Sequence, residues 1–333
     1  MDLSVLDLFK VSLGPSSSHT MGPMVAVKSF MQGCGDRVLK QAHQLKIHLY
    51  GSLALTGRGH GTDGAVILGA QGATASTLDP EDARSQVKAV KSSHQLRLLG
   101  RYLIPFSPSD DIIFHRETRL SYHPNGMRFE LFTADGQVLA QDTYYSLGGG
   151  FVVSEQQLKN KKHELRRKVP PYAFKTGAGL ITQCRLHDLN LIELILCNEA
   201  TWRPESETLK QIRYIWQVMN LCIDRGICQE GILPGGLCVK RRALAVYQKL
   251  QANHDSRQEH HLSWVSLYAL AVNEENAAGS VVVTAPTNGA AGIIPAVIRY
   301  YLEFIKDSDE GNVVEFLLVA GMIGILFKEG ASI

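Results

Sequence analysis

The hydrophobic pattern in the first half of the chain contains several short runs that are typical of strands. In residues 44–50 apolar side chains alternate with polar ones, which predicts a half-buried strand. Residues 127–132 and 137–145 flank an Ala-Asp-Gly turn, a pattern typical of a β-hairpin, and residues 112–114 are a further short apolar run. Before these strands we expect mixed helix and loop, with a break near Pro80. The pattern predicts an N-terminal α/β region.

From residue 172 onward the pattern is almost entirely helical. Within residues 209–222 apolar side chains recur at the spacing of one helical face, which is typical of a helix packed on a core. These side chains are Ile212, Ile215, Trp216 and Met219. Residues 264–273 predict another apolar helix. The longest apolar run, residues 316–327, is shorter than the ~20 residues of a membrane span, so it predicts a buried helix and no membrane segment.

The length of 333 residues exceeds that of one ordinary domain, so we expect two. Three consecutive glycines, 148–150, follow the last predicted strand and mark the end of the first domain. We expect an α/β domain over residues 1–153, a linker over 154–171 and a mostly α-helical domain over 172–333.

Composition narrows the class of protein. Hydrophobic residues make up 45% of the chain and charged residues 20%, which is typical of a globular protein. A net charge of +2 argues against a dedicated nucleic-acid surface. The six cysteines contain no C-x-x-C pair, and the N-terminus has no apolar signal region. We therefore expect a cytoplasmic protein with reduced thiols.

The stretch from Gly14 to Pro23 concentrates the polar chemistry of the chain. Between two Gly/Pro pairs it holds four hydroxyls and an imidazole: Ser16, Ser17, Ser18, His19 and Thr20. A helix N-cap needs only one hydroxyl, so the surplus favours a loop that binds an anion or substrate at the start of the following helix. A plain N-cap is the alternative interpretation.

Two further loops combine glycine with polar side chains. His60 lies between glycines in residues 56–63, where no complete nucleotide-binding fingerprint is present. Thr287 and Asn288 lie in a Pro/Asn/Gly turn that follows the β-branched run 281–283. Each loop alone could be ordinary, because exposed histidines and Asn-Gly turns are common. Together, the histidine-bearing loops favour a shared site.

Six segments of the chain are specific enough to indicate a family. They are Leu-Asp-Leu-Phe-Lys (6–10), Gly-Pro-Ser-Ser-Ser-His-Thr (14–20), Tyr-Gly-Ser-Leu followed by Thr-Gly-x-Gly-His (50–60), Tyr-Tyr-Ser-Leu-Gly-Gly-Gly (144–150), Ala-Val-Asn-Glu-Glu-Asn-Ala-Ala-Gly (271–279) and Thr-Ala-Pro-Thr-Asn-Gly (284–289). With these segments in this order, the sequence resembles the iron–sulfur L-serine dehydratases, or L-serine ammonia-lyases, in their single-chain form.

The resemblance implies conversion of L-serine to pyruvate and ammonia, which would feed serine degradation and gluconeogenesis. It implies an N-terminal domain similar to the allosteric substrate-binding domains of some phosphoglycerate dehydrogenases, a helical catalytic domain and a homodimer. In the family, three cysteines hold a 4Fe–4S cluster whose open iron acts on the serine hydroxyl while a base removes the α-proton. L-serine is the expected partner, with no nucleic acid and no membrane.

The chain departs from the family pattern at its end. In the family, a segment similar to residues 328–333 leads into a glycine-rich stretch with the first cluster cysteine, but this chain ends at Ile333. We therefore expect an incomplete catalytic domain, no cluster ligands in this chain, impaired activity, poor solubility and an exposed apolar patch near residues 316–327. The alternative function is a non-catalytic serine- or anion-binding module for regulation or dimerisation.

The resemblance and the loop chemistry together suggest roles for individual residues. His19 and His60 are the acid/base candidates, and spacing does not decide between them. We expect the substrate carboxylate to contact side chains from both domains, namely Ser16, Ser17, Ser18, Thr20, Thr287 and Asn288. We expect no metal ligand among the residues of this chain. A pyridoxal-phosphate dehydratase is a third interpretation, disfavoured because no suitable lysine neighbours the loops.

Overall fold

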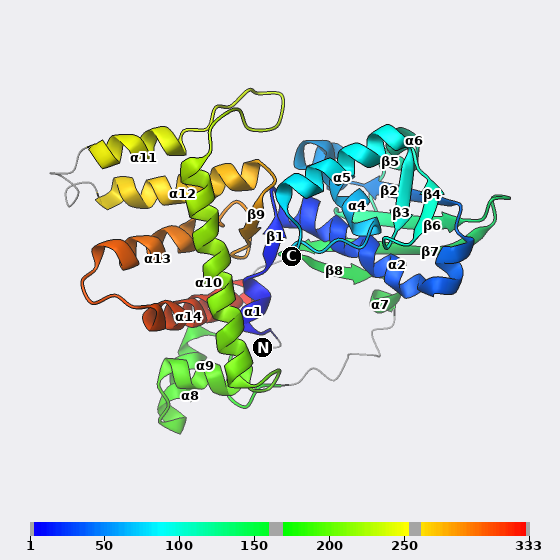
Figure 1. Cartoon of the computed structure of the whole chain (residues 1–333). Helices are drawn as coiled ribbons and strands as arrows, with labels where there is room; N and C mark the ends of the chain where they lie inside the picture. The colour runs from blue at the N-terminus through cyan, green and yellow to red at the C-terminus, as the bar shows by residue number, and fades with distance from the viewer. Residues whose placement is uncertain (1–2, 160–168, 253–260, 331–333) are drawn as a thin grey trace. The chain divides into compact units, whose positions relative to one another are not determined.

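A computed structural model describes residues 3–159, 169–252 and 261–330 of the chain (Figure 1). The described residues form two compact units. The α/β unit comprises residues 12–159 and 278–281, and the helical unit comprises the others. Residues 3–11 thus pack with the helical unit, whereas the sequence placed them in the α/β domain.

The α/β unit is built on a five-stranded sheet with the strand order β5-β2-β6-β7-β8. The strands are β2 (Gln44–Tyr50), β5 (Ile112–His115), β6 (Gly126–Phe132), β7 (Val138–Gly148) and β8 (Phe151–Ser154). β2 pairs with β5 in parallel, and the other pairings are antiparallel. The structure confirms the predicted strand at residues 44–50 and the hairpin that follows it.

Helices α2 (Gly22–Gln41) and α4 (Thr62–Ala70) cover one face of this sheet (Figure 1). Apolar side chains of both helices join those of β2 and β6 in one hydrophobic core. Along β2 the burial alternates, so that Ile47 is fully buried whereas His48, on the opposite face, is only half-buried. This alternation is the one that the hydrophobic pattern predicted.

The segment predicted as mixed helix and loop is more regular than expected. The expected break lies at residues 71–79, and Pro80 begins helix α5 (Pro80–Ser93), because a proline in the first helical turn needs no N–H partner. The side chain of Asp79 caps this helix. The sequence did not predict the hairpin of β3 (Gln95–Leu98) and β4 (Tyr102–Pro105) that follows.

Several short elements complete the α/β unit. They are the π-helix η1 (Ser17–Met21), the 3-10 helix η2 (Gly57–His60), and the helices α3 (Ser52–Thr56), α6 (Pro108–Asp111) and α7 (Glu155–Lys159). The predicted linker, 154–171, thus begins with the last residue of β8 and with α7, and its residues 160–168 lie outside the described residues.

The helical unit contains eight helices among its described residues. They are α1 (Val5–Leu8), α8 (Gly177–His187), α9 (Leu191–Glu199), α10 (Glu205–Cys228), α11 (Ala243–Ala252), α12 (His261–Ala277), α13 (Ile293–Phe304) and α14 (Glu310–Gly330). The four predicted core residues of α10 are buried, which confirms that face of the helix. A two-stranded sheet of β1 (Val11–Leu13) and β9 (Val281–Val283) lies where the chain passes between units.

Helix α12 continues beyond its predicted end at residue 273, into the Asn-Glu-Glu-Asn segment. Two buried carboxylates explain why this acidic segment stays helical. Glu274 accepts hydrogen bonds from the backbone N–H groups of Arg242 (2.7 Å) and Ala243 (3.3 Å). Glu275 pairs with Arg241 at 2.8 Å. The segment therefore holds the start of α11 in place.

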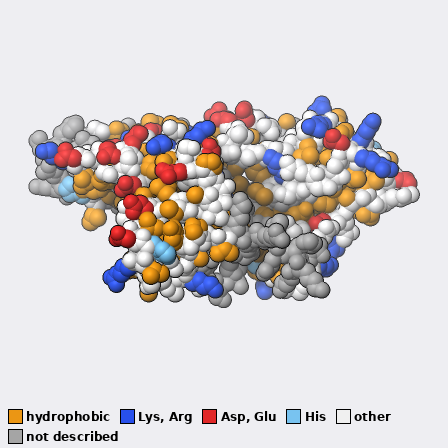
Figure 2. All heavy atoms as spheres, turned by 90° about the horizontal axis from the view of Figure 1, so that it is seen from below, with side chains coloured by type: hydrophobic (Ala, Val, Ile, Leu, Met, Phe, Trp, Pro, Cys, Tyr) orange, Lys and Arg blue, Asp and Glu red, His pale blue; other side chains and the backbone are white. Residues whose placement is uncertain are grey.

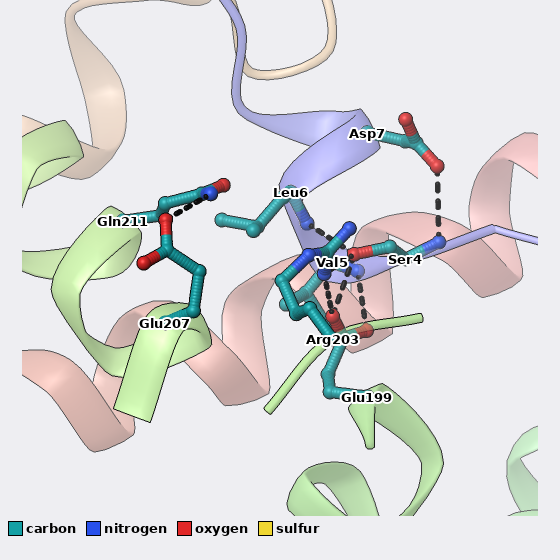
Figure 3. A network of polar contacts seen from close by, with 8 residues as sticks. All are labelled: Ser4, Val5, Leu6, Asp7, Glu199, Arg203, Glu207 and Gln211. Atoms are coloured by element: carbon teal, nitrogen blue, oxygen red, sulfur yellow. Dashed lines mark hydrogen bonds and ion pairs between the residues drawn. The ribbon is translucent and has the colours of Figure 1, made fainter. Parts of the chain in front are cut away.

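The N-terminal helix α1 is held by a buried polar network (Figure 3). Ser4 and Asp7 form a capping box at its start. The carboxylate of Glu199, at the end of α9, accepts hydrogen bonds from the Ser4 hydroxyl (2.6 Å) and the Val5 N–H (2.9 Å). Arg203 donates to the same carboxylate at 2.6 Å. This network explains why residues 3–11 belong with the helical unit.

Helix α14 is longer than the predicted run 316–327 and not fully buried, in line with the exposed apolar patch expected there. It spans 21 residues, and its described apolar side chains include the exposed Phe316, Ile323 and Phe327. Part of it lines an apolar groove with α9 and α13, and hydrophobic side chains are visible at the surface of the helical unit in Figure 2. By length and composition alone, the part from Glu310 to Lys328 could cross a membrane, a criterion that core helices of soluble proteins also meet.

Candidate functional site

The serine-rich stretch is a helical turn and not an open loop. Ser17–Met21 form the π-helix η1, which runs directly into α2. The Ser16 side chain accepts a hydrogen bond from the His19 N–H at 3.1 Å and so caps this turn. Short π-helical segments are frequent at functional sites, because they place side chains where a regular helix would not. The predicted helix therefore starts earlier than its apolar pattern indicated.

Both ring nitrogens of His19 are bound by hydroxyl groups. Nδ1 is 2.8 Å from the Ser18 Oγ, and Nε2 is 3.0 Å from the Ser52 Oγ. A serine hydroxyl can donate or accept, so these contacts suit either neutral tautomer. The two contacts fix the orientation of the ring.

His60 is held through one ring nitrogen only. Its Nδ1 lies 2.9 Å from the backbone oxygen of Thr56, and a carbonyl oxygen can only accept, so this Nδ1 carries the proton. In the neutral ring, Nε2 therefore has a free electron pair. Within the described residues no hydrogen bond to that Nε2 is found.

The two imidazoles lie side by side in the α/β unit. Their ring centroids are 4.9 Å apart and the ring planes are inclined by 39°. Burial lowers the pKa of His19, the nearby His60 lowers it further, and the hydrogen bond with Ser52 acts in the opposite direction. His19 is therefore neutral at pH 7 and can accept a proton directly.

Hydrogen bonds to backbone carbonyls join the two histidine-bearing segments. The Thr20 hydroxyl donates to the His60 carbonyl at 2.8 Å, and the Thr62 hydroxyl donates to the His19 carbonyl at 2.6 Å. The Thr20 oxygen also accepts the Ser16 N–H at 3.3 Å. The structure thus brings His19 and His60 together, as the shared-site hypothesis required.

Strand β7 and the glycines at its end are hydrogen-bonded to the serine-rich turn. The buried Ser146 hydroxyl donates to the Ser18 carbonyl at 2.8 Å, and the Gly149 N–H donates to the buried Ser17 Oγ at 3.3 Å. Gly22 leaves room for this contact, since a Cβ there would lie 2.0 Å from the Ser146 Oγ. The serine-rich turn is therefore fixed by β7.

The other predicted site residues belong to the helical unit. Thr287 is exposed, and its hydroxyl accepts the Ala290 N–H in a turn. Asn288 is buried, and its amide group donates to the Asn276 side chain at 3.0 Å. Asn276 belongs to the Asn-Glu-Glu-Asn segment at the end of α12. Contact of Thr287 or Asn288 with the substrate stays a prediction.

The described residues offer no ligand set for an iron–sulfur cluster. All six cysteines are free and described, and no group of three or more His, Cys, Asp or Glu side chains in the described part could hold a metal. Burial raises the pKa of Cys34 to about 11 and that of Cys222 to about 12, so both thiols stay protonated at neutral pH. The residues described here therefore do not fit a 4Fe–4S cluster.

Sequence reasoning assigned no role to Ser52, Thr62 or Ser146, although all three touch the histidine-bearing segments. Ser52 and Ser146 lie inside motifs that carried the resemblance, and Thr62 lies two residues after the end of the motif that contains Ser52. A search for hydroxyl residues in or beside those motifs would have found them. Their partners, however, are decided by tertiary contacts.

The chain combines an α/β unit that carries a paired-histidine site with a second, helical unit. A family model for the serine dehydratase beta chain matches residues 4–157, and one for the serine dehydratase alpha chain matches residues 186–333. The chain belongs to the serine dehydratase family and is, by family, an enzyme of the carbon–nitrogen lyase class.

Relatives match along the whole chain. L-serine dehydratase of Streptomyces coelicolor is 48% identical over 334 residues, which cover 100% of this chain and 73% of the relative. L-serine dehydratase of Haemophilus influenzae is 42% identical over 335 residues, which cover 99% of this chain and 73% of the relative. L-serine dehydratase 2 of Escherichia coli is 41% identical over 335 residues, with the same coverage.

Proposed function

We propose that the chain binds L-serine at the paired-histidine site and takes part in its deamination to pyruvate and ammonia. The observation that carries this proposal is the His19–His60 pair, held 4.9 Å apart by serine and threonine hydroxyls in the α/β unit. The names of the relatives, all L-serine dehydratases, support the choice of substrate. We further propose a cytoplasmic homodimer that serves serine degradation and gluconeogenesis.

His60 is the better candidate for the base that removes the α-proton. Its Nδ1 proton is held by the Thr56 carbonyl, so the electron pair on Nε2 points away from that contact. Both nitrogens of His19 are already bound by hydroxyls, so His19 would have to break a hydrogen bond to act as base. We therefore assign His60 as the base and His19 as the partner that orients the site.

The substrate carboxylate is proposed to bind at the serine-rich turn. Ser16 and Ser18 are half-buried and lie beside His19, with their hydroxyls 3.4 Å apart. Ser17 is buried and bonded to Gly149, so it supports the turn and would reach substrate only after a small movement. Thr287 and Asn288 are proposed to complete the site from the helical unit.

In the proposed reaction, L-serine loses its α-proton and hydroxide to give aminoacrylate and water. Aminoacrylate tautomerises to an imine, which water hydrolyses to pyruvate and ammonia. Hydroxide is a poor leaving group, and an electrophile such as the iron of a 4Fe–4S cluster would assist its loss. Because the described cysteines do not fit such a cluster, we derive no step through it.

The test combines binding and turnover. Calorimetry with the purified chain should show binding of L-serine but not of D-serine, and turnover is followed as pyruvate in a full-length L-serine dehydratase that carries the same residues. His19→Ala and His60→Ala should each lower turnover by about 10²–10⁴, the range for general-base work. His43→Ala, at a histidine of the same unit outside the site, is the matched control.

Two outcomes would redirect the proposal. If L-serine does not bind, or if both histidine variants keep the wild-type rate, the assignment of the site is wrong. If L-serine binds to the chain but the same site in the full-length enzyme can be altered without loss of pyruvate formation, the alternative of a non-catalytic serine-binding module is favoured.

A further inference from the structure

The spacing of the two histidines is not set by a bond between their rings. The ring nitrogens of His19 are bound by Ser18 and Ser52, and Nδ1 of His60 is bound by the Thr56 carbonyl. The rings also come from different segments, η1 and η2. Their distance therefore depends on where the two backbones are held.

Two hydrogen bonds that run in opposite directions hold those backbones together. Thr20, next to His19, donates to the carbonyl of His60, and Thr62, two residues after His60, donates to the carbonyl of His19. Each threonine thus anchors the histidine of the other segment.

Burial shows that these hydroxyls serve the protein and are not available to substrate. Thr62 is completely buried and Thr20 is 5% exposed. Thr62 also occupies space that Gly57 leaves open, because a Cβ at Gly57 would lie 2.9 Å from the Thr62 Oγ1. A buried hydroxyl whose proton is already donated to a carbonyl cannot also donate it to a substrate carboxylate.

We propose that Thr20 and Thr62 are positioning residues, which together form a reciprocal clamp that sets the spacing of His19 and His60 for proton transfer. The clamp rests on the proposed function of that pair. It also changes the role expected for Thr20, which would act through His60 and not by contact with the substrate carboxylate.

The test removes each hydroxyl while keeping the side-chain shape. In Thr62→Val and Thr20→Val, NMR of histidine-labelled protein should show a weaker nuclear Overhauser effect between the two rings. The pKa of His19 should rise in both, because His60 moves away and repels its charged form less. In a full-length L-serine dehydratase that carries the same threonines, turnover should fall by about 10- to 100-fold, with little change in the Kd for L-serine, as expected for a misplaced base.

Conservative and matched variants separate the clamp from simple destabilisation. Thr62→Ser and Thr20→Ser keep the hydroxyl and should restore the ring contact and the rate. Thr77→Val makes the same change at an exposed threonine of the same unit and should have no effect. If Thr62→Val does not fold, Thr20→Val tests the clamp from the other segment.

The NMR readout does not depend on catalysis, so the two proposals fail separately. If the ring contact and the His19 titration are unchanged in both folded valine variants, the clamp is refuted even where turnover falls. If they change as expected but wild-type protein neither binds nor converts L-serine, the clamp stands and the proposed function fails.

Discussion

Gly22 and Ser146 occupy a space in which no further carbon atom fits. A Cβ at Gly22 would lie 2.0 Å from the Oγ and 2.7 Å from the Cβ of Ser146, whose hydroxyl holds the Ser18 carbonyl. At the residue scale, the site therefore depends on small residues as well as on its histidines. Glycine is required at residue 22 by the close approach of β7 to the start of α2.

Gly22→Ala should destabilise the α/β unit by about 1–3 kcal/mol, the usual cost of overpacking. It should also weaken L-serine binding, because Ser146 must move away from the turn. The control is Gly33→Ala in the same helix, where a Cβ meets nothing within 4 Å. That change should stabilise by about 0.5–1 kcal/mol through helix propensity. Equal denaturation midpoints for the two variants would contradict this account.

At the element scale, the anchoring of α1 shows how a very short helix is stabilised. Four residues make a marginal helix by themselves, so the tertiary contacts must hold it. The Glu199 carboxylate is 2% exposed and faces three donors, from Ser4, Val5 and Arg203 (Figure 3). Burial raises the pKa of Glu199, and these donors counteract the rise.

Glu199→Gln should release α1 from the helical unit. The carboxamide would turn an NH₂ group toward at least one of these donors, and an unsatisfied buried group costs about 1–3 kcal/mol. Amide hydrogen exchange of residues 5–8 should accelerate, and the denaturation midpoint should fall. Glu205→Gln, an exposed residue in the first turn of α10, is the matched control. Unchanged exchange in Glu199→Gln would show that α1 is held by apolar contacts alone.

At the scale of the whole molecule, the two units should respond differently to pH. Burial lowers the pKa of three histidines, His19, His48 and His123, and all three lie in the α/β unit. The unfolded chain therefore takes up protons more readily than the folded unit when the pH falls below 6.5, the ordinary histidine value. Their contribution to stability is complete above that pH and is lost progressively below it.

We expect the α/β unit to lose stability as the pH falls below 6.5, before the helical unit does. All three tryptophans, Trp202, Trp216 and Trp264, lie in the helical unit, so their fluorescence reports that unit alone. Amide hydrogen exchange in β2 and β6 should report the stability of the α/β unit. In the folded unit His123 stays neutral and accepts the Asn125 N–H. Glutamine does not titrate, so His123→Gln should reduce the dependence of stability on pH. Coincident transitions of both units would contradict the expectation.

The sequence by itself determined the elements and the chemistry that they carry. Alternation in residues 44–50 is a local property, so it predicted β2 correctly, and the repeat in 209–222 predicted the buried face of α10 for the same reason. The motifs likewise predicted the family, because residue types and their spacing can be compared without knowledge of the fold.

Tertiary structure decided which groups meet. The pairing of His19 with His60, the crossed bonds of Thr20 and Thr62, and the docking of α1 on Glu199 join residues that lie far apart in the chain. Hydrophobic periodicity contains no information about such partners, because it reports only which face of an element is buried. For the same reason the sequence left the choice of base open, and only the Thr56 carbonyl beside His60 Nδ1 supplied a reason to prefer His60.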